Sequence, residues 1–321
     1  MSGEALPLRP AGPIREDVIR ARERLAGDVH ETPVLTSRTL DLMVGCELYF
    51  KCENLQRSGS FKIRGALNAA RMFLSESGAV ESGGPLVTHS SGNHGAALAL
   101  AGRETGLDVV VVVPENAPQA KKDNIARYGA RLVFCGPTIN DREAAVATEL
   151  ANGGHLVPPY NDSRVIAGQG TLGLEVAMQV PELQQLWVPV GGGGMASGCV
   201  LAVGQELQVT GTEPLLADDA YESLATGVLV GPRPPTTVAD GLRGALGDIT
   251  FALLRDYKLR IERVTDEQIV AAQRLLMECL KVVVEPSGAV PFAALLAAVE
   301  RGHVAAQQRI ALVISGGNMD L

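Results

Sequence analysis

Aromatic residues and basic patches are scarce in this sequence, and long apolar runs are absent. Phe, Trp and Tyr make up only 4% of the 321 residues, and 28 Lys and Arg stand against 36 Asp and Glu, which gives a net charge of −8. A chain with neither a basic stripe nor a series of stacking rings is not expected to bind nucleic acid. No run approaches the roughly 18 apolar residues of a membrane span, so none is predicted.

Paired cysteines are also missing. The five cysteines are scattered, odd in number and include no Cys-x-x-Cys motif, a pattern that predicts free thiols in a reducing compartment. Residues 1–17 have no apolar core of the kind found in a secretory signal, so we expect a cytoplasmic protein. The cysteines are Cys46, Cys52, Cys135, Cys199 and Cys279.

The sequence does contain short apolar runs that alternate with helical patterns. Residues 109–113 are five consecutive valines, typical of a strand buried on both faces. The alternation implies parallel sheets with crossover helices, and the Gly-, Pro- and Asn-rich residues 153–170 predict a crossing between domains. Strands are predicted at 47–52, 85–90, 109–113, 131–135, 186–190, 209–213 and 310–315, and helices at 15–29, 66–74, 96–104, 118–128, 141–152, 172–179, 195–205, 248–256, 266–280 and 286–298.

Lys62 lies among small residues and one aromatic, just before the helix predicted at 66–74. One interpretation is a solvated amine, although the positive end of a helix disfavours a cation there. The other is functional. A lysine in a partly desolvated pocket has a lowered pKa and attacks carbonyl groups, including the aldehyde of pyridoxal phosphate (PLP).

Four predicted strand ends carry unusual residues, and ligands of open α/β sheets bind beyond such ends. Residues 90–95 (SSGNHG) fit either a capped turn or a site for a carboxylate or ring oxygen. The four glycines at 191–194 favour a phosphate site, because their backbone can approach the phosphate closely. Each glycine also costs the folded chain about 0.5–1 kcal/mol in conformational entropy, so a purely structural run of four is disfavoured. Ser315 could meet a ring nitrogen or simply close the last strand. The acidic residues at 213–219 suit a hard cation or a solvated turn.

The same glycines allow a competing interpretation. Gly191, Gly193 and Ala196 fit the G-x-G-x-x-A dinucleotide pattern, and Glu213 follows at the distance of a ribose-binding acid. A match of this kind is weak by itself. It also leaves Lys62 without a function.

Taken together, the motifs resemble the fold-type II PLP enzymes, and within them the serine racemase and serine/threonine dehydratase family. The resemblance implies an α/β fold of two domains, each a mostly parallel twisted sheet flanked by helices. It further implies a large PLP-binding domain from residues 1–78 and 159–321, and a small mobile domain at 79–158. The motifs are HETPVLTS (30–37), FKCENLQRSGSFKIRGA (50–66), THSSGNHG (88–95), AGQGT (167–171), VPVGGGGMASG (188–198), TEPLLADD (212–219), VEPSGA (284–289) and ISGGN (314–318).

By this resemblance, each strand-end loop has a ligand. Lys62 holds PLP as a Schiff base, with Phe61 beside the ring, Asn93 at the ring 3-oxygen, Ser315 at the pyridine nitrogen, and Gly191, Gly192, Gly193, Gly194 and the Met195 amide at the phosphate. The substrate carboxylate lies on Ser90, Gly92, Asn93 and His94, with Ser91 on the face opposite Lys62. Glu213, Asp219 and the carbonyl of Ala217 bind Mg²⁺ or Ca²⁺.

The resemblance implies a dehydratase that converts L-serine or L-threonine to a 2-oxo acid and ammonia. Lys62 is then the si-face base and Ser91 the acid or base on the other face. Alternatives are serine racemisation as the main activity, dehydration of 3-hydroxyaspartate, and a PLP- or amino-acid-binding protein without turnover. Arg142 could bind an acidic β-substituent or be a solvated helix charge.

Two further properties of the family are expectations here. A homodimer is implied by the resemblance alone. Activation by ATP stays open: Lys121 and Asn318 match nucleotide-activated members, whereas Ala96 replaces their glutamine.

Overall fold

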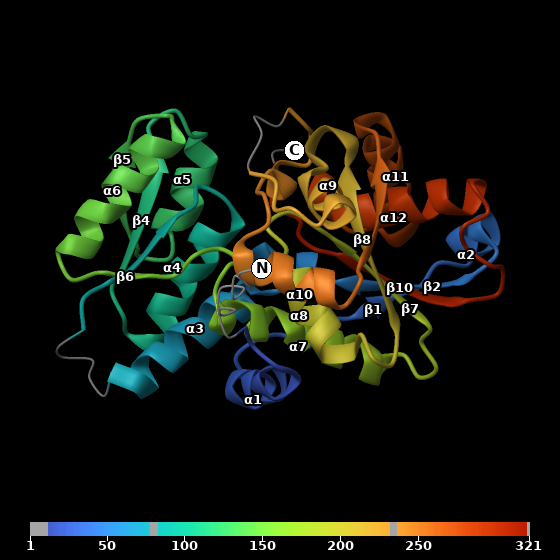
Figure 1. Cartoon of the computed structure of the whole chain (residues 1–321), viewed down its shortest axis with the longest axis horizontal. Helices are drawn as coiled ribbons and strands as arrows, with labels where there is room; N and C mark the ends of the chain where they lie inside the picture. The colour runs from blue at the N-terminus through green and yellow to red at the C-terminus, as the bar shows by residue number, and fades with distance from the viewer. Residues whose placement is uncertain (1–11, 78–82, 232–235, 320–321) are drawn as a thin grey trace, which may run out of the picture.

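Two sheets organise the chain (Figure 1). The computed structural model describes residues 12–77, 83–231 and 236–319. The larger sheet has the order β1-β2-β10-β7-β8-β9 and the smaller one the order β5-β4-β3-β6. All neighbouring strands run parallel except β1 and β2. The predicted α/β class with mostly parallel sheets is therefore confirmed.

The elements alternate along the chain much as the sequence predicts. The strands are β1 (Val34–Leu35), β2 (Glu47–Cys52), β3 (Leu86–His89), β4 (Val109–Pro114), β5 (Arg131–Cys135), β6 (His155–Leu156), β7 (Gln185–Pro189), β8 (Gln208–Pro214), β9 (Arg260–Val264) and β10 (Arg309–Ile314). The α-helices are α1 (Arg15–Leu25), α2 (Arg38–Val44), α3 (Lys62–Ser77), α4 (Asn93–Thr105), α5 (Gln119–Ala126), α6 (Ile139–Ala151), α7 (Ser163–Gln179), α8 (Gly194–Val203), α9 (Asp219–Thr226), α10 (Asp248–Asp256), α11 (Asp266–Leu280) and α12 (Pro286–Glu300).

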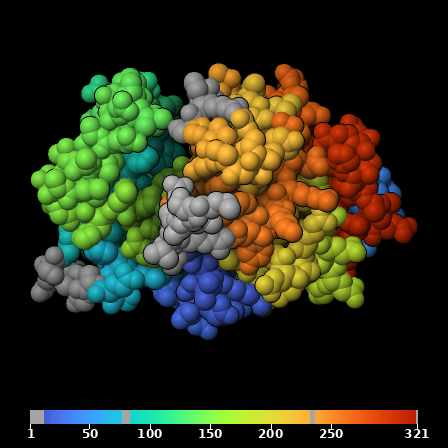
Figure 2. Space-filling model, viewed as in Figure 1, coloured from blue at the N-terminus to red at the C-terminus, as the bar shows by residue number. Residues whose placement is uncertain are grey.

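The central strands of both sheets are buried on two faces, which explains their unbroken apolar runs. In β10, Ile310, Leu312 and Ile314 pack on the side of α11 and α12, while Ala311 and Val313 pack on the side of α7 and α8. The valines of β4 divide in the same way between the α3–α4 side and the α6 side. In Figures 1 and 2 the helices of the smaller sheet lie to the left and those of the larger sheet to the right.

The helix predicted at 172–179 begins nine residues earlier than expected, because α7 starts at Ser163, inside the segment predicted as a crossing between domains. Glycine disfavours helix, and the run AGQGT lowers the local propensity. Tertiary packing reverses the preference. A Cβ on Gly168 would lie 2.5 Å from the carbonyl oxygen of Arg64 in α3, and one on Gly170 would lie 2.6 Å from that of Gly198 in α8. The glycines therefore allow three helices to pack backbone to backbone.

Three other expectations concern the whole chain. The smaller sheet is built from residues 86–156, inside the predicted small domain, but the boundary at 78/79 lies outside the described residues and the division stays a prediction. All five cysteines are free thiols, as predicted. Across the described ranges, no helix combines the length and apolarity needed to cross a membrane.

Candidate active site

Lys62 is the first residue of α3, four residues before the predicted helix start. Its Nζ donates a hydrogen bond to the carbonyl of Pro159 (2.9 Å). Burial lowers the pKa of Lys62 to about 8, and the negative charge of Glu285 opposes that shift. A substantial fraction of this amine is therefore neutral, and nucleophilic, near neutral to weakly basic pH.

The loop before Lys62 is tied to the end of β10. Ser60 bridges to Gly316, and the backbone N–H of Phe61 donates to the carbonyl of Ser315 (3.1 Å). Ser58 and Gly59 both have left-handed backbones, and a Cβ on Gly59 would lie 2.3 Å from Asn318. These contacts bring together the segments of Lys62 and Ser315, two predicted cofactor-binding residues that lie far apart in the sequence.

Asn93 joins the same cluster through both ends of its amide. Its Nδ2 donates to the two carboxylate oxygens of Glu285 (3.0 and 3.2 Å), and its Oδ1 accepts from Asn318 (2.9 Å). Burial raises the pKa of Glu285 to about 7, although the bond from Asn93 lowers it. The motif VEPSGA contained Glu285, but our sequence analysis gave it no role.

The glycine loop lies against Tyr160, a second residue that the sequence analysis missed. A Cβ on Gly192 would lie 2.2 Å from the Tyr160 ring, and one on Gly194 would lie 2.9 Å from the Tyr160 Cβ. Gly193 has a left-handed backbone (φ 82°) and begins the turn into α8. The segment at 159–161 therefore contacts both Lys62 and the glycine loop. An aromatic after two prolines was the available signal, in a stretch interpreted only as a domain crossing.

The loop at 90–94 lies between β3 and α4, with Ser90, Ser91 and Gly92 half-buried. His94 is buried, and its Nε2 bonds to the carbonyl of Val157 (3.0 Å). A carbonyl only accepts, so Nε2 carries the proton. Burial lowers the pKa of His94 to about 3, which keeps the ring neutral. Its Nε2 therefore ties α4 to the residue after β6, and its Nδ1 is buried without a partner among the described residues.

Arg142 projects from α6 toward the end of β3. Its Nη2 donates to the carbonyl of Pro137 (3.3 Å), and its Nε is buried with no acceptor among the described residues. Burial, and after it the charge of Arg142, lowers the pKa of His89. Because His89 directly precedes Ser90, the guanidinium lies beside the loop predicted to bind the substrate.

The acidic loop after β8 is buried rather than solvated. Glu213 is fully buried and accepts the backbone N–H groups of Ala220 (3.1 Å) and Tyr221 (2.8 Å) at the start of α9. Burial raises the pKa of Glu213 well above its usual value, and the nearby charges of Asp219 and Asp218 add to that shift. No group of three or more His, Cys, Asp or Glu side chains suited to a metal occurs within the described ranges. The predicted set has only two such side chains plus the carbonyl of Ala217.

A family model described as "Pyridoxal-phosphate dependent enzyme" matches residues 25–316. The chain belongs to this family of PLP-dependent enzymes. It is 42% identical over 313 residues to the beta-hydroxyaspartate dehydratase of Paracoccus denitrificans (strain Pd 1222), covering 96% of this chain and 97% of that protein. It is 43% identical over 312 residues to the serine racemase of Homo sapiens, covering 95% and 91%. The structure of maize serine racemase superposes with a TM-score of 0.90 at 39% identity, covering 97% and 95%.

The residues of this PLP-dependent enzyme fit its cofactor. Side chains on the glycine loop would collide with Tyr160, so glycine is needed there. The loop leads into backbone N–H groups at the start of α8, which suit a phosphate. The hydroxyls of Ser60 and Ser197 are buried without a hydrogen-bond partner in the part of the chain that the structure describes. Lys62, Asn93, Ser315, the glycine loop and Met195 would hold PLP. The dinucleotide interpretation is wrong, because the chain belongs to a PLP-dependent family. Glu213, which that interpretation assigned to a ribose, accepts hydrogen bonds from the start of α9 instead.

Proposed function

We propose that this protein is an ammonia-lyase that dehydrates small β-hydroxy amino acids, with L-serine and L-threonine as substrates. The observation that carries the proposal is the amine of Lys62. It has a pKa lowered to about 8, at the point where the loops around Asn93, Ser315 and Gly192 converge. An amine in that state can accept a proton from the substrate.

The chemistry divides between the cofactor and the chain. PLP, when bound, supplies an electron sink for the electron pair left at Cα. Lys62 Nζ takes the Cα proton, and the backbone N–H groups at the start of α4 orient the substrate carboxylate. The β-hydroxyl leaves with a proton as water. The resulting enamine then takes up water and releases ammonia, so the products are a 2-oxo acid and ammonia.

Racemisation is the second activity that we propose for the same residues. It requires a proton to be returned to Cα on the face opposite Lys62, and the half-buried Ser91 is the candidate donor. The relatives named serine racemase support this activity. Chiral analysis of products from L-serine separates the two, because only racemisation yields D-serine.

A specific observation favours a third substrate, 3-hydroxyaspartate. The guanidinium of Arg142 lies next to His89 and has no carboxylate partner among the described residues. A planar guanidinium matches a carboxylate in a bidentate manner. The second carboxylate of 3-hydroxyaspartate supplies that partner, whereas serine and threonine do not. The relative named beta-hydroxyaspartate dehydratase supports the same choice.

Arg142→Gln tests this substrate assignment. We expect kcat/KM for L-threo-3-hydroxyaspartate to fall about 10- to 100-fold, the value of a charge-assisted hydrogen bond. For L-serine it should stay within about threefold, because no carboxylate reaches Arg142 there. The measurement is 2-oxo acid formation. Arg127→Gln, an exposed arginine beyond α5, is the matched control. Equal losses of kcat/KM on both substrates would show that Arg142 does not bind the second carboxylate.

We also propose a Mg²⁺ or Ca²⁺ site at Glu213, Asp219 and the Ala217 carbonyl. Buried carboxylates packed together are stabilised by a cation. EDTA should therefore lower the melting temperature, since a metal at 100 times its Kd contributes about 2.7 kcal/mol to stability. Glu213→Gln should abolish the EDTA effect. An unchanged melting temperature, with no metal by elemental analysis, would refute the site.

ATP activation is not part of the proposal. Ala96 replaces the expected glutamine, and the amine of Lys121 already pairs with Asp240 (2.5 Å). The homodimer and the mobile small domain at 79–158 remain proposals that follow the family.

A further inference from the structure

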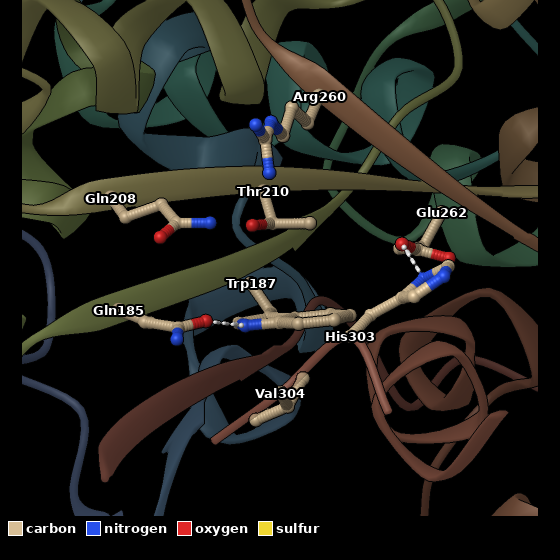
Figure 3. Close-up of a pocket in the computed structure, with 8 residues that line it drawn as sticks. All are labelled: Gln185, Trp187, Gln208, Thr210, Arg260, Glu262, His303 and Val304. Carbon is tan, nitrogen blue, oxygen red and sulfur yellow. Dashed lines mark hydrogen bonds and ion pairs between the residues drawn. The ribbon is translucent and has the colours of Figure 1, made fainter. Parts of the chain in front are cut away.

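A small pocket opens at the edge of the larger sheet where β7, β8 and β9 begin (Figure 3). It encloses about 290 Å³. Gln185, Gln208 and Arg260 are the first residues of these strands, whereas the glycine loop and the acidic loop follow β7 and β8 at the opposite edge. With a rise of about 3.3 Å per residue, roughly 15–20 Å separates the two edges. The residues that line the pocket are Gln185, Trp187, Gln208, Thr210, Arg260, Glu262, His303 and Val304.

The pocket exists because α12 ends before it covers this part of the sheet. The helix packs on β7, β8 and β9 and stops at Glu300, and His303 and Val304 form the rim just beyond it. The strand register places Trp187, Thr210 and Arg260 side by side on three neighbouring strands. Figure 3 shows Arg260 turned toward Thr210, with the Trp187 ring below both.

Besides the amide of Gln208, two polar groups that line the pocket have no partner among the described residues. Arg260 is exposed and makes no hydrogen bond or ion pair with any described residue. Thr210 is only 3% exposed, and its buried hydroxyl has no hydrogen-bond partner in the same ranges. The neighbouring groups are occupied. Glu262 pairs with Arg301 (2.5 Å) and His303 (3.0 Å), and Trp187 donates to Gln185 (2.8 Å).

We propose that this pocket is a second binding site, separate from the active site, for a small oxyanion-bearing molecule. Arg260 contributes a permanent positive charge and a planar donor fork that fits a carboxylate or a phosphate. Thr210 adds a hydroxyl donor, and the amide of Gln208 adds N–H groups. The volume suits a molecule of the size of a dicarboxylic acid. Glu262 is already neutralised by Arg301, so Arg260 is the cation left for the ligand.

The chain supplies its own reporter, because Trp187 is its single tryptophan. The experiment titrates the holoenzyme with succinate and with inorganic phosphate, at constant ionic strength set with chloride, and records tryptophan fluorescence. We expect saturation with at least one of the two anions, and the anion that saturates identifies the ligand as a carboxylate or a phosphate. Arg260→Gln should weaken binding by about tenfold or more. Arg274→Gln, an exposed arginine on α11, should leave it unchanged.

Thr210→Val separates a ligand-binding role from a structural one. Removing a buried hydroxyl without a partner should raise the melting temperature of the ligand-free protein in either case. Only a binding role predicts that the same variant also binds the anion more weakly. The turnover of L-serine should stay within about twofold of wild type in both pocket variants. Failure of both anions to saturate the signal, or an identical response in Arg260→Gln, would overturn the proposal.

Discussion

Lys62→Ala is expected to abolish turnover of every β-hydroxy amino acid. Loss of the base alone removes about 10²–10⁴-fold of rate, and the same substitution removes the amine that holds the cofactor. Purified variant protein should therefore also lose the visible absorbance of bound PLP. Both effects follow from one atom, because Nζ is the amine that we propose both holds the cofactor and takes the Cα proton.

The control for this variant is Lys122→Ala. Lys122 lies on α5, where its amine donates to the carbonyl of Glu115 (2.6 Å). The Lys122→Ala variant should retain both the turnover and the absorbance of bound PLP. Retained turnover and retained absorbance in Lys62→Ala would contradict the proposed role of Lys62, whichever substrate the enzyme prefers.

Glu53→Gln is expected to cause the largest loss of stability. Glu53 and Arg64 are both buried and share two bonds of 2.8 Å. Burial alone would raise the pKa of Glu53, but the charge and hydrogen bonds of Arg64 hold it below its usual value. Removing one charge of a buried pair costs about 3–5 kcal/mol. Glu175, which also pairs with Arg64 (2.6 Å), offsets only part of that loss, because its side chain is less buried than that of Glu53. Arg64 follows Lys62 by two residues, so the pair also fixes the start of α3.

Chemical unfolding measures this prediction, with Glu206→Gln as its control. Glu206 pairs with Arg15 at 2.7 Å, but both side chains are about half exposed (52% and 43%). An exposed pair contributes only about 0–1 kcal/mol. Similar losses of unfolding free energy in the two variants would show that burial does not govern the Glu53–Arg64 pair.

The parts of the fold that depend on local pattern could be predicted from the sequence. The valine run of β4 and the capped start of α11 at Thr265 are examples, since both signals lie within a few residues. The start of α3 was missed. Phe61 is held by Ser315, and the sequence pattern cannot show a contact between residues so far apart.

The candidate site could be predicted where a motif carries its chemistry, as at Lys62 and the glycine loop. Glu285 and Tyr160 could not be assigned a role in this way. Glu285 gains its role from Asn93, which lies 192 residues earlier, and Tyr160 gains its role from packing on Gly192 and Gly194. Both are ordinary residues until the fold places them, and the pKa of Glu285 is raised first by its burial and then by the charge of Asp240.

The most direct test of the account is to locate the covalent attachment of the cofactor. Holoenzyme is reduced with borohydride, digested, and its peptides are mapped by mass spectrometry. The account predicts one modified peptide, which carries the mass of the reduced cofactor on Lys62. Modification of a different lysine, or none in protein that turns over L-serine or 3-hydroxyaspartate, would contradict it.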